Sequence, residues 1–228
     1  GQALAYLADS TNSPYAPLLQ ALDFSDSSGQ EITSALHTLS AESYNAAAQA
    51  TLRQLKAQDR LLLFKQWAEP LTESTRIYGD VLYSAYDSNA AAWDSDGFSA
   101  VVGADTKLSP SWSVGVNLTL SSLDTDIDGK HHASADAQSI LAGVRTLYRP
   151  SDTGFYLQGS VRAGLQDGDL ERRLSIGSYH ADMKSDWQAF IGTAQAALGY
   201  DLMWNGANYS LRTGPVGSLN YALLRTPD

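Results

Sequence analysis

The sequence predicts a mainly β fold: a transmembrane antiparallel β-barrel, preceded by a helical segment and by one long α-helix that threads the pore. Beyond residue 72, apolar and polar side chains alternate with the period of a strand, whereas the residues before it repeat with the period of a helix. The predicted connections alternate between short and long, as in outer-membrane barrels. These signals divide the chain into a helical segment (1–39), the pore helix (40–69) and the N-terminal part of a barrel (70–228).

The composition disfavours several classes of function. The 228 residues include 15 Lys+Arg and 25 Asp+Glu, a net charge of -10 that argues against binding nucleic acid. There is no cysteine, which excludes disulfides, thiolate zinc sites and cysteine nucleophiles. Apolar runs such as Leu61–Phe64 are far shorter than the roughly 18 residues of a membrane-spanning helix. The chain opens at Gly1 without a signal sequence, so we expect an internal piece of a longer protein.

A long helix is predicted between Ser40 and Trp67, because this stretch contains neither glycine nor proline. Ser40 suits an N-cap, Glu42 lies in the first turn, and Pro70 follows the end. Apolar side chains recur at Tyr44, Ala48, Leu52, Leu55, Leu62 and Leu63. The polar positions that we expect to face the pore are Gln49, Arg53, Lys56 and Asp59. A separate small helical domain is the alternative for this part of the chain.

Seven strands are predicted after the helix, each apolar on one face and small or polar on the other. They are Ile77–Asp87, Phe98–Thr106, Trp112–Ser121, Ile140–Arg149, Phe155–Gln166, Trp187–Trp204 and Tyr209–Leu224. Their lengths are near the roughly 9 to 11 residues that a tilted membrane strand needs. We expect the polar face to line the pore at Asp105, Asn117, Arg145, Gln158 and Arg162. For the two arginines, contact with the helix and simple solvation both stay open.

The connections predict which end of the barrel faces the periplasm. Residues 109–111 and 150–154 are short turns, whereas 88–96, 123–135 and 167–185 are rich in Asp, Ser, Gly and His and are predicted to be long loops. Aromatic residues cluster near the short turns, at Trp112, Tyr148, Phe155, Trp204 and Tyr209. Short turns are periplasmic in outer-membrane barrels, so we expect the helix to enter from that side.

A soluble β-sandwich is the alternative fold, because it also alternates with a period of two. The outer face of a sandwich meets bulk water and is usually rich in Lys, Glu and Thr. Here the polar face consists mostly of Gly, Ser, Asn and Gln with a few arginines. Small hydrogen-bonding side chains suit a crowded polar lumen, which favours the barrel.

Five phrases carry a family resemblance: Leu4–Asp9, Leu18–Asp23, Ala35–Tyr44, Gly97–Leu108 and Trp112–Gly115. Their order and spacing resemble the translocator region of autotransporters, the type V secretion proteins of Gram-negative bacteria. The third phrase is similar to the opening of the family's junction helix, and the last two to its second strand and the turn that follows. The similarity covers nearly the whole chain.

The resemblance implies a twelve-stranded outer-membrane barrel with a helix in its pore, which exports an upstream passenger to the cell surface. Residues 1–39 would be the passenger–barrel junction. Implied partners are outer-membrane lipid, the barrel-assembly machinery, periplasmic chaperones and the protein's own passenger. An outer-membrane porin and a barrel-borne esterase are the alternatives, but a porin does not need such a helix.

Two departures from the family pattern lead to further expectations. The chain ends at Asp228 without the terminal aromatic strand, so about seven of twelve strands are present and the piece is not expected to close or fold alone. Asn45 stands alone among alanines, without the paired asparagines of self-cleaving members. Autocleavage is therefore not expected.

No residue is predicted to be catalytic, to bind a cofactor or to bind a metal, so the chain is not expected to be an enzyme. Asp124, Asp126, Asp128 and Gly129 match the first half of a calcium loop, but Ala135 occupies the position of the bidentate Glu, which favours a solvated loop. The histidines at 131, 132 and 180 lack metal-ligand spacing. Nucleophile-elbow and phosphate-loop motifs are absent from the sequence.

Overall fold

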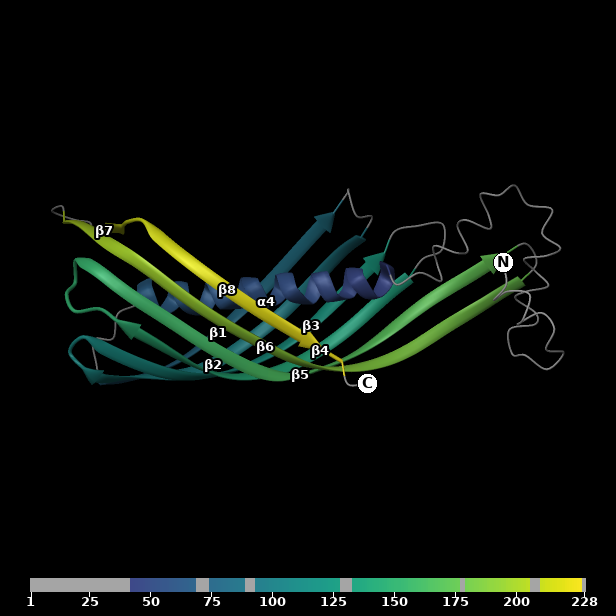
Figure 1. The fold of residues 1–228 in the computed structure, drawn as a ribbon, viewed down its shortest axis with the longest axis horizontal. Helices are drawn as coiled ribbons and strands as arrows, with labels where there is room; N and C mark the ends of the chain where they lie inside the picture. Colours follow the sequence, from purple (N-terminus) through teal and green to yellow (C-terminus); the bar gives the residue numbers. More distant parts are fainter. Residues whose placement is uncertain are drawn as a thin grey trace, which may run out of the picture.

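The structure is a computed structural model that describes residues 42–68, 74–88, 93–127, 133–176, 179–205 and 210–226. These residues form a helix, α4 (Glu42–Ala68), and eight strands (Figure 1). The strands are β1 (Thr75–Ser88), β2 (Trp93–Ser109), β3 (Trp112–Ile127), β4 (Ala133–Tyr148), β5 (Gly154–Ile176), β6 (Tyr179–Asn205), β7 (Ser210–Thr213) and β8 (Val216–Arg225). The predicted helical segment 1–39, Ser40, His131, His132 and Tyr209 lie outside the described residues.

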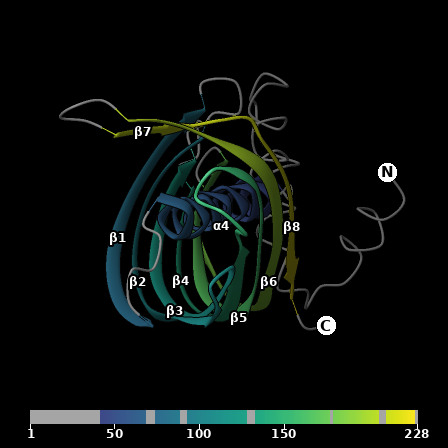
Figure 2. The ribbon, with the colours of Figure 1, turned by 90° about the vertical axis from the view of Figure 1, so that its left-hand side faces the viewer.

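The strands form one antiparallel sheet in the order of the chain from β1 to β6, and β6 pairs with both β7 and β8. Figure 2 shows the sheet curving around α4 on several sides. Among the described strands, β1 and β8 do not pair with each other, so the sheet is open at these two edges. The mainly β antiparallel fold with one preceding helix is as predicted.

The strands are longer than predicted, and most of each expected long loop is strand. The prediction of loops at 88–96, 123–135 and 167–185 is wrong over Trp93–Asp96, over the outer end of β3 and over most of the β5–β6 hairpin. The ladder continues there because the inward-facing side chains, such as Trp93 and Leu170, are buried at 3% and 1% exposure. The outward face of these strand ends is polar because it lies beyond the apolar band, and polar composition alone does not distinguish such strand ends from loops.

The last predicted strand is two strands, which makes eight instead of seven. β7 ends at Thr213 and β8 begins at Val216, with Gly214 and Pro215 between them. Proline has no N–H to donate to a ladder, so the strand pairing is interrupted there. The Pro215 carbonyl still accepts a hydrogen bond of 3.1 Å from the Tyr200 N–H.

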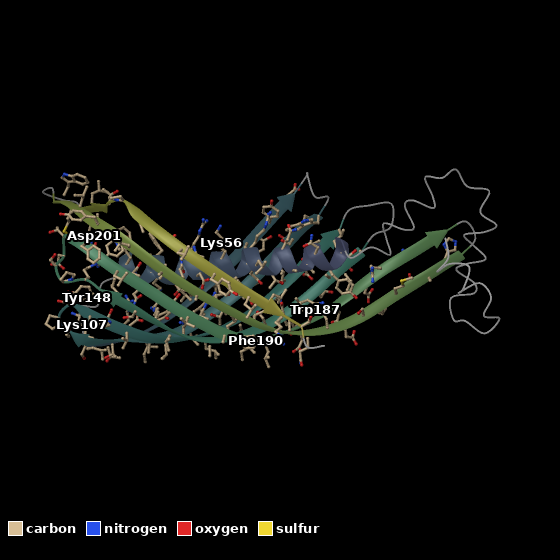
Figure 3. All side chains as sticks on the ribbon, in the orientation of Figure 1. Lys56, Lys107, Tyr148, Trp187, Phe190 and Asp201 are labelled. Carbon is tan, nitrogen blue, oxygen red and sulfur yellow. The ribbon has the colours of Figure 1, made fainter. Side chains whose placement is uncertain are left out.

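Two short turns have the predicted positions. β2 and β3 are joined by Pro110 and Ser111, and β4 and β5 by residues 149–153. The Arg149 N–H donates to the Ser111 carbonyl at 2.7 Å, which ties the two turns together. Figure 3 shows Lys107, Tyr148 and Asp201 together at this end of the sheet.

The two faces of the sheet are the reverse of those in a soluble sandwich. Val116, Val144 and Val161 are aligned on three neighbouring strands, and 56–58% of each side chain is exposed. The next residues along β4 and β5, Arg145 and Arg162, are 2% and 1% exposed on the inner face. An exposed apolar face around a buried polar interior is the pattern of a membrane barrel.

The register marks where the apolar outer face ends. One aligned row across β2 to β6 is apolar and consists of Ala100, Leu120, Ile140, Leu165 and Phe190. Four residues farther along each strand, away from the short turns, every residue of the row is aspartate: Asp96, Asp124, Asp136, Asp169 and Asp186. The strands therefore extend beyond the apolar band, and their outer parts carry acidic side chains on the outward face.

Candidate functional site: the helix and the inner face of the sheet

The helix α4 lies along the concave inner face of the sheet, with its last residue near the short turns (Figures 1 and 2). Its buried face contains small and polar side chains as well as leucines: Ala46, Ala50, Gln54, Gln58, Asp59 and Leu62. Leu52 is 37% exposed, so the apolar spacing in the sequence does not identify the buried face of this helix. Where the inner face of the sheet is polar, the helix residues that contact it are polar as well.

One buried ion pair joins the middle of the helix to β5. Arg162 Nη2 lies 2.6 Å from Asp59 Oδ1, and both residues are at most 2% exposed. The same guanidinium donates to Gln58 Oε1 at 3.0 Å and to the Leu55 carbonyl at 3.2 Å. Thr193, on β6, donates its hydroxyl to Asp59 at 3.2 Å. Each buried charge is thus both paired and hydrogen-bonded, which offsets its desolvation.

A second cluster lies closer to the short turns. Arg145 forms a bidentate pair with Asp105, at 2.8 Å from Nε and 2.6 Å from Nη2, and donates from Nη1 to the Leu62 carbonyl at 2.8 Å. Arg76, on β1, contacts the same carboxylate at 2.8 Å. The Tyr78 ring lies 4.2 Å from the Arg145 guanidinium. The cluster therefore joins β1, β2 and β4 to the helix backbone.

Glycine makes room for this packing. A Cβ atom at Gly103 would lie 2.3 Å from the Tyr78 hydroxyl oxygen, so a side chain there would displace the ring. Gly199 relates to Tyr156 in the same way, with the ring 2.4 Å from the added atom. Both tyrosines are buried on the inner face at 5–7% exposure. Each ring occupies the space that a side chain at the neighbouring glycine would need.

The end of the helix is held at the short-turn end of the sheet. The Trp67 carbonyl accepts hydrogen bonds from Arg149 Nη2 at 3.0 Å and from Arg212 Nη1 at 3.5 Å. The Trp67 indole N–H donates to Asp201 at 2.7 Å, and Asp201 lies 3.3 Å from Arg149. Guanidinium groups satisfy the carbonyls that the last turn leaves open and complement its partial negative charge.

The outer part of the helix makes a different kind of contact. Ala46 and Ala50 pack against Trp93, Leu123 and Ala137 in one buried cluster, against which Ile127 and Trp187 also lean. Ala47 packs with Ala135 and Leu170 in a second. The hydrogen bonds here join neutral groups, such as the Tyr44 hydroxyl and Ser185 Oγ at 2.9 Å and the Thr51 and Gln166 side chains, while the Arg172 guanidinium lies 5.2 Å from the centre of the Tyr44 ring.

The five residues predicted to line the pore all lie on the inner face, at 1–5% exposure. Arg145, Gln158 and Arg162 donate to the helix, and Asp105 contacts it through Arg145. Neither amide atom of Asn117 has a hydrogen-bond partner among the described residues. Their role in lining a pore stays a prediction.

The four predicted helix residues do not share one environment. Asp59 is buried, and the Arg53 guanidinium lies 3.4 Å from the centre of the Tyr86 ring. Gln49 is partly buried. Lys56 is exposed on the open side of the helix (Figure 3).

Sequence reasoning did not identify Trp67 or Asp201 as part of this site. Asp201 follows Tyr200, which faces outward in β6, so the alternation of a strand is enough to assign Asp201 to the inner face. Nothing in the sequence linked it to the helix, because their contact joins residues 134 positions apart.

The part of the predicted calcium-like loop that the structure describes is β-strand. Asp124 and Asp126 belong to β3 and point outward, while Asp128 and Gly129 lie outside the described residues. His180 belongs to β6. In the described part of the chain, no group of three His, Cys, Asp or Glu side chains could hold a metal ion. No helix among the described residues has the length and apolarity needed to cross a membrane.

A curved antiparallel sheet with an exposed apolar outside, a buried polar inside and a helix along its inner face defines a membrane-barrel type of fold. The comparison with family models specifies it further: residues 75–228 match the model described as autotransporter beta-domain. The chain belongs to this family of outer-membrane β-barrels. No curated protein matches the sequence.

Two solved structures are similar to this chain. The translocator domain of the autotransporter NalP from Neisseria meningitidis has a TM-score of 0.59 at 18% identity, over 79% of this chain. The match spans 61% of that chain, so the present chain corresponds to less than two thirds of it. The beta domain of the Bordetella autotransporter BrkA has a TM-score of 0.45 at 17% identity, over 68% of this chain and 70% of that one.

Proposed function

We propose that this chain is part of an outer-membrane translocator of a Gram-negative bacterium, whose barrel carries α4 in its pore and exports a passenger encoded upstream to the cell surface. The observation that carries the proposal is the buried contact of α4 with the inner face through Asp59–Arg162 and the Trp67 carbonyl. A wall built to receive a helix is unnecessary for a diffusion pore. Family membership supports the same function, with the barrel-assembly machinery and periplasmic chaperones as partners during insertion.

The direction of export follows from the two ends of the helix. Its C-terminal end lies beside the short turns, which are periplasmic in outer-membrane barrels. Its N-terminal end lies between the outward extensions of the strands, where Tyr44 contacts Ser185. A passenger attached upstream of the helix would therefore emerge on the outer side.

An epitope experiment on the complete protein tests this topology. One tag is placed upstream of Gly1 and, in a matched variant, the same tag is placed in the turn at Pro110–Ser111. We expect protease added to intact cells to remove the upstream tag and to spare the turn tag until the outer membrane is permeabilised. Protection of the upstream tag, or cleavage of the turn tag in intact cells, would contradict the proposed orientation.

A crosslink tests whether the helix occupies the lumen. The Thr51 hydroxyl and Gln166 side chain are in contact, and Gln166 is 1% exposed on the inner face. Since the 228 residues contain no cysteine, a Thr51→Cys/Gln166→Cys pair should react with a short bifunctional thiol reagent. The matched control is Thr51→Cys/Leu165→Cys, because Leu165 points outward and is 51% exposed. Crosslinking of the control but not of the first pair would exclude the helix from the lumen.

A further inference from the structure

Buried polar atoms that lack a hydrogen-bond partner are concentrated in the inner part of the lumen, from the Arg162 level to the short turns. Among the described residues they include the amide atoms of Gln66 and Asn117 and the hydroxyls of Tyr78 and Ser160. Gln195 Oε1, two nitrogens of Arg149 and one of Arg212 belong to the same part. The apolar cluster at the outer end contributes one such atom, Trp187 Nε1.

So many unpaired polar groups are not stable in a dry interior. Leaving a buried donor or acceptor without a partner costs about 1–3 kcal/mol for each group. Water supplies such partners in protein interiors and typically makes two to four hydrogen bonds there. These atoms have almost no accessible surface, so the inner lumen completes its hydrogen bonding by admitting single ordered water molecules between its side chains.

The outer end has the opposite chemistry. We define the collar as Ala46, Ala50, Trp93, Leu123 and Ala137, the residues of the apolar cluster between the helix and the wall. All five are at most 7% exposed. At its edge, the Arg53 guanidinium covers the rings of Tyr86 and Trp93, at 3.4 and 5.1 Å. Apolar cavities in proteins stay dry, and apolar constrictions block ions because water leaves them.

We propose that the collar is the barrier to water and ions in this pore, and that the polar lumen between the collar and the short turns is a vestibule that admits water from the periplasm. The inference rests on the proposed function, since it requires α4 to occupy a complete barrel. It adds where along the pore the seal lies: at the outer mouth, where contacts are apolar, and not at the charged clusters.

Conductance of the complete protein in planar lipid bilayers tests the position of the seal. We expect Trp93→Ala to raise the open-state current several-fold. Leu123→Asn, which changes polarity at similar volume, should do the same if the first variant does not insert. The control is Ser160→Ala, which removes a vestibule hydroxyl that has no hydrogen-bond partner among the described residues and should leave the current unchanged. A larger current in the control than in either collar variant would overturn the proposal.

Cysteine reactivity tests whether water and small solutes enter the vestibule from the periplasmic side. A charged methanethiosulfonate reagent is added to one chamber and then to the other, with Ser160→Cys in the vestibule or Ala137→Cys in the collar. Ser160→Cys should react only from the side of the short turns, and Ala137→Cys from neither side. Reaction of Ser160→Cys from the outer side, or from no side, would contradict the inference. The Thr51–Gln166 crosslink distinguishes failure of this inference from failure of the proposed function. If the crosslink does not form, the helix is not in the lumen and the proposed function fails. If it forms, a negative result in the two experiments above contradicts only the position of the seal.

Discussion

The outer and inner halves of α4 are held by the same wall through different interactions. From Ser43 to Gln54 the helix presents alanines to apolar wall residues, and the side-chain hydrogen bonds of Tyr44, Thr51 and Gln54 are between neutral groups. From Leu55 to Trp67 it is held by guanidinium and ammonium groups of the wall or of the helix itself. Lys65, for example, pairs with Asp80 on β1 at 2.7 Å.

The difference shows how a helix can be both positioned and sealed. Directional hydrogen bonds to the carbonyls of Leu55, Leu62 and Trp67 fix the depth and rotation of the inner half. Small apolar side chains lack such direction but allow close approach and exclude water. The inner half thus determines position, and the outer half closes the remaining space.

The largest effect is expected from breaking the buried pair. Arg162→Met leaves Asp59 buried without its cation, which should destabilise the folded protein by about 3–5 kcal/mol. Urea unfolding of the complete protein in detergent measures it. Arg162→Met/Asp59→Leu should recover most of the loss, because no charge is then left unpaired. Equal losses in the single and double variants would mean that this pair does not hold the helix.

A charge on the outer face tests the contrast between the two faces of the sheet. Val116→Lys, within the apolar band, should destabilise the barrel by about 2–4 kcal/mol in lipid. The matched variant Asn117→Lys is one residue away on the polar inner face and should cost less. Refolding into lipid vesicles across a denaturant series compares them. Similar losses at both positions would contradict the assignment of the outer face to lipid.

Overpacking of the collar should have a smaller effect. Ala50 is 1% exposed, so Ala50→Leu forces additional methyl and methylene groups into a filled space, at a cost of about 1–3 kcal/mol. Lys56→Leu on the exposed face of the same helix is the control and should change stability little. The same urea titration measures both. If Ala50→Leu were neutral, the collar would not be closely packed.

The acidic outer ends of the strands predict a modest pH dependence. A hydrogen bond with Asp124 and partial burial, together with repulsion from Asp124, Asp169 and Asp126, raise the pKa of Asp136 to about 6. Because the folded state then holds a proton that the unfolded chain releases, stability should rise as the pH falls from about 6 toward the ordinary value of 3.8. The side chain is solvent-exposed and screened, so the gain should be below about 1 kcal/mol.

The control for this pH dependence is Asp136→Asn. It removes the repulsion at neutral pH and should both raise stability at pH 7 and flatten the profile between pH 4 and 7. Unfolding midpoints measured across this range give the result. A profile that keeps its slope in Asp136→Asn would assign the dependence to other groups.

The smallest effect is expected at the tip of the β5–β6 hairpin. Lys184 and Glu171 form an ion pair there, but both side chains are more than half exposed. Exposed pairs contribute little because water and salt screen them, so Lys184→Met should hardly change stability. A loss as large as that of Arg162→Met would show that burial is not what distinguishes these two pairs.

The sequence by itself determined the period of each segment, and therefore the helix, the antiparallel strands and the face to which each residue belongs. Val116 and Asn117 were separated correctly because successive strand residues point to opposite faces, whatever they pack against. The short turn at Pro110 was predictable for a similarly local reason, since proline and serine favour turns. The likeness to the autotransporter family was visible from short phrases of the same segments.

Only the tertiary structure decided where the strands end and which polar groups meet. Residues 167–176 looked like a loop, yet they continue β5 because Leu170 packs on the helix and the ladder to β6 persists. Asp59 pairs with Arg162, and the Trp67 carbonyl accepts a hydrogen bond from Arg149; both contacts join residues more than 80 positions apart. The alternation of a strand assigns a side chain to a face, but register and curvature decide its neighbour, and these depend on the whole sheet.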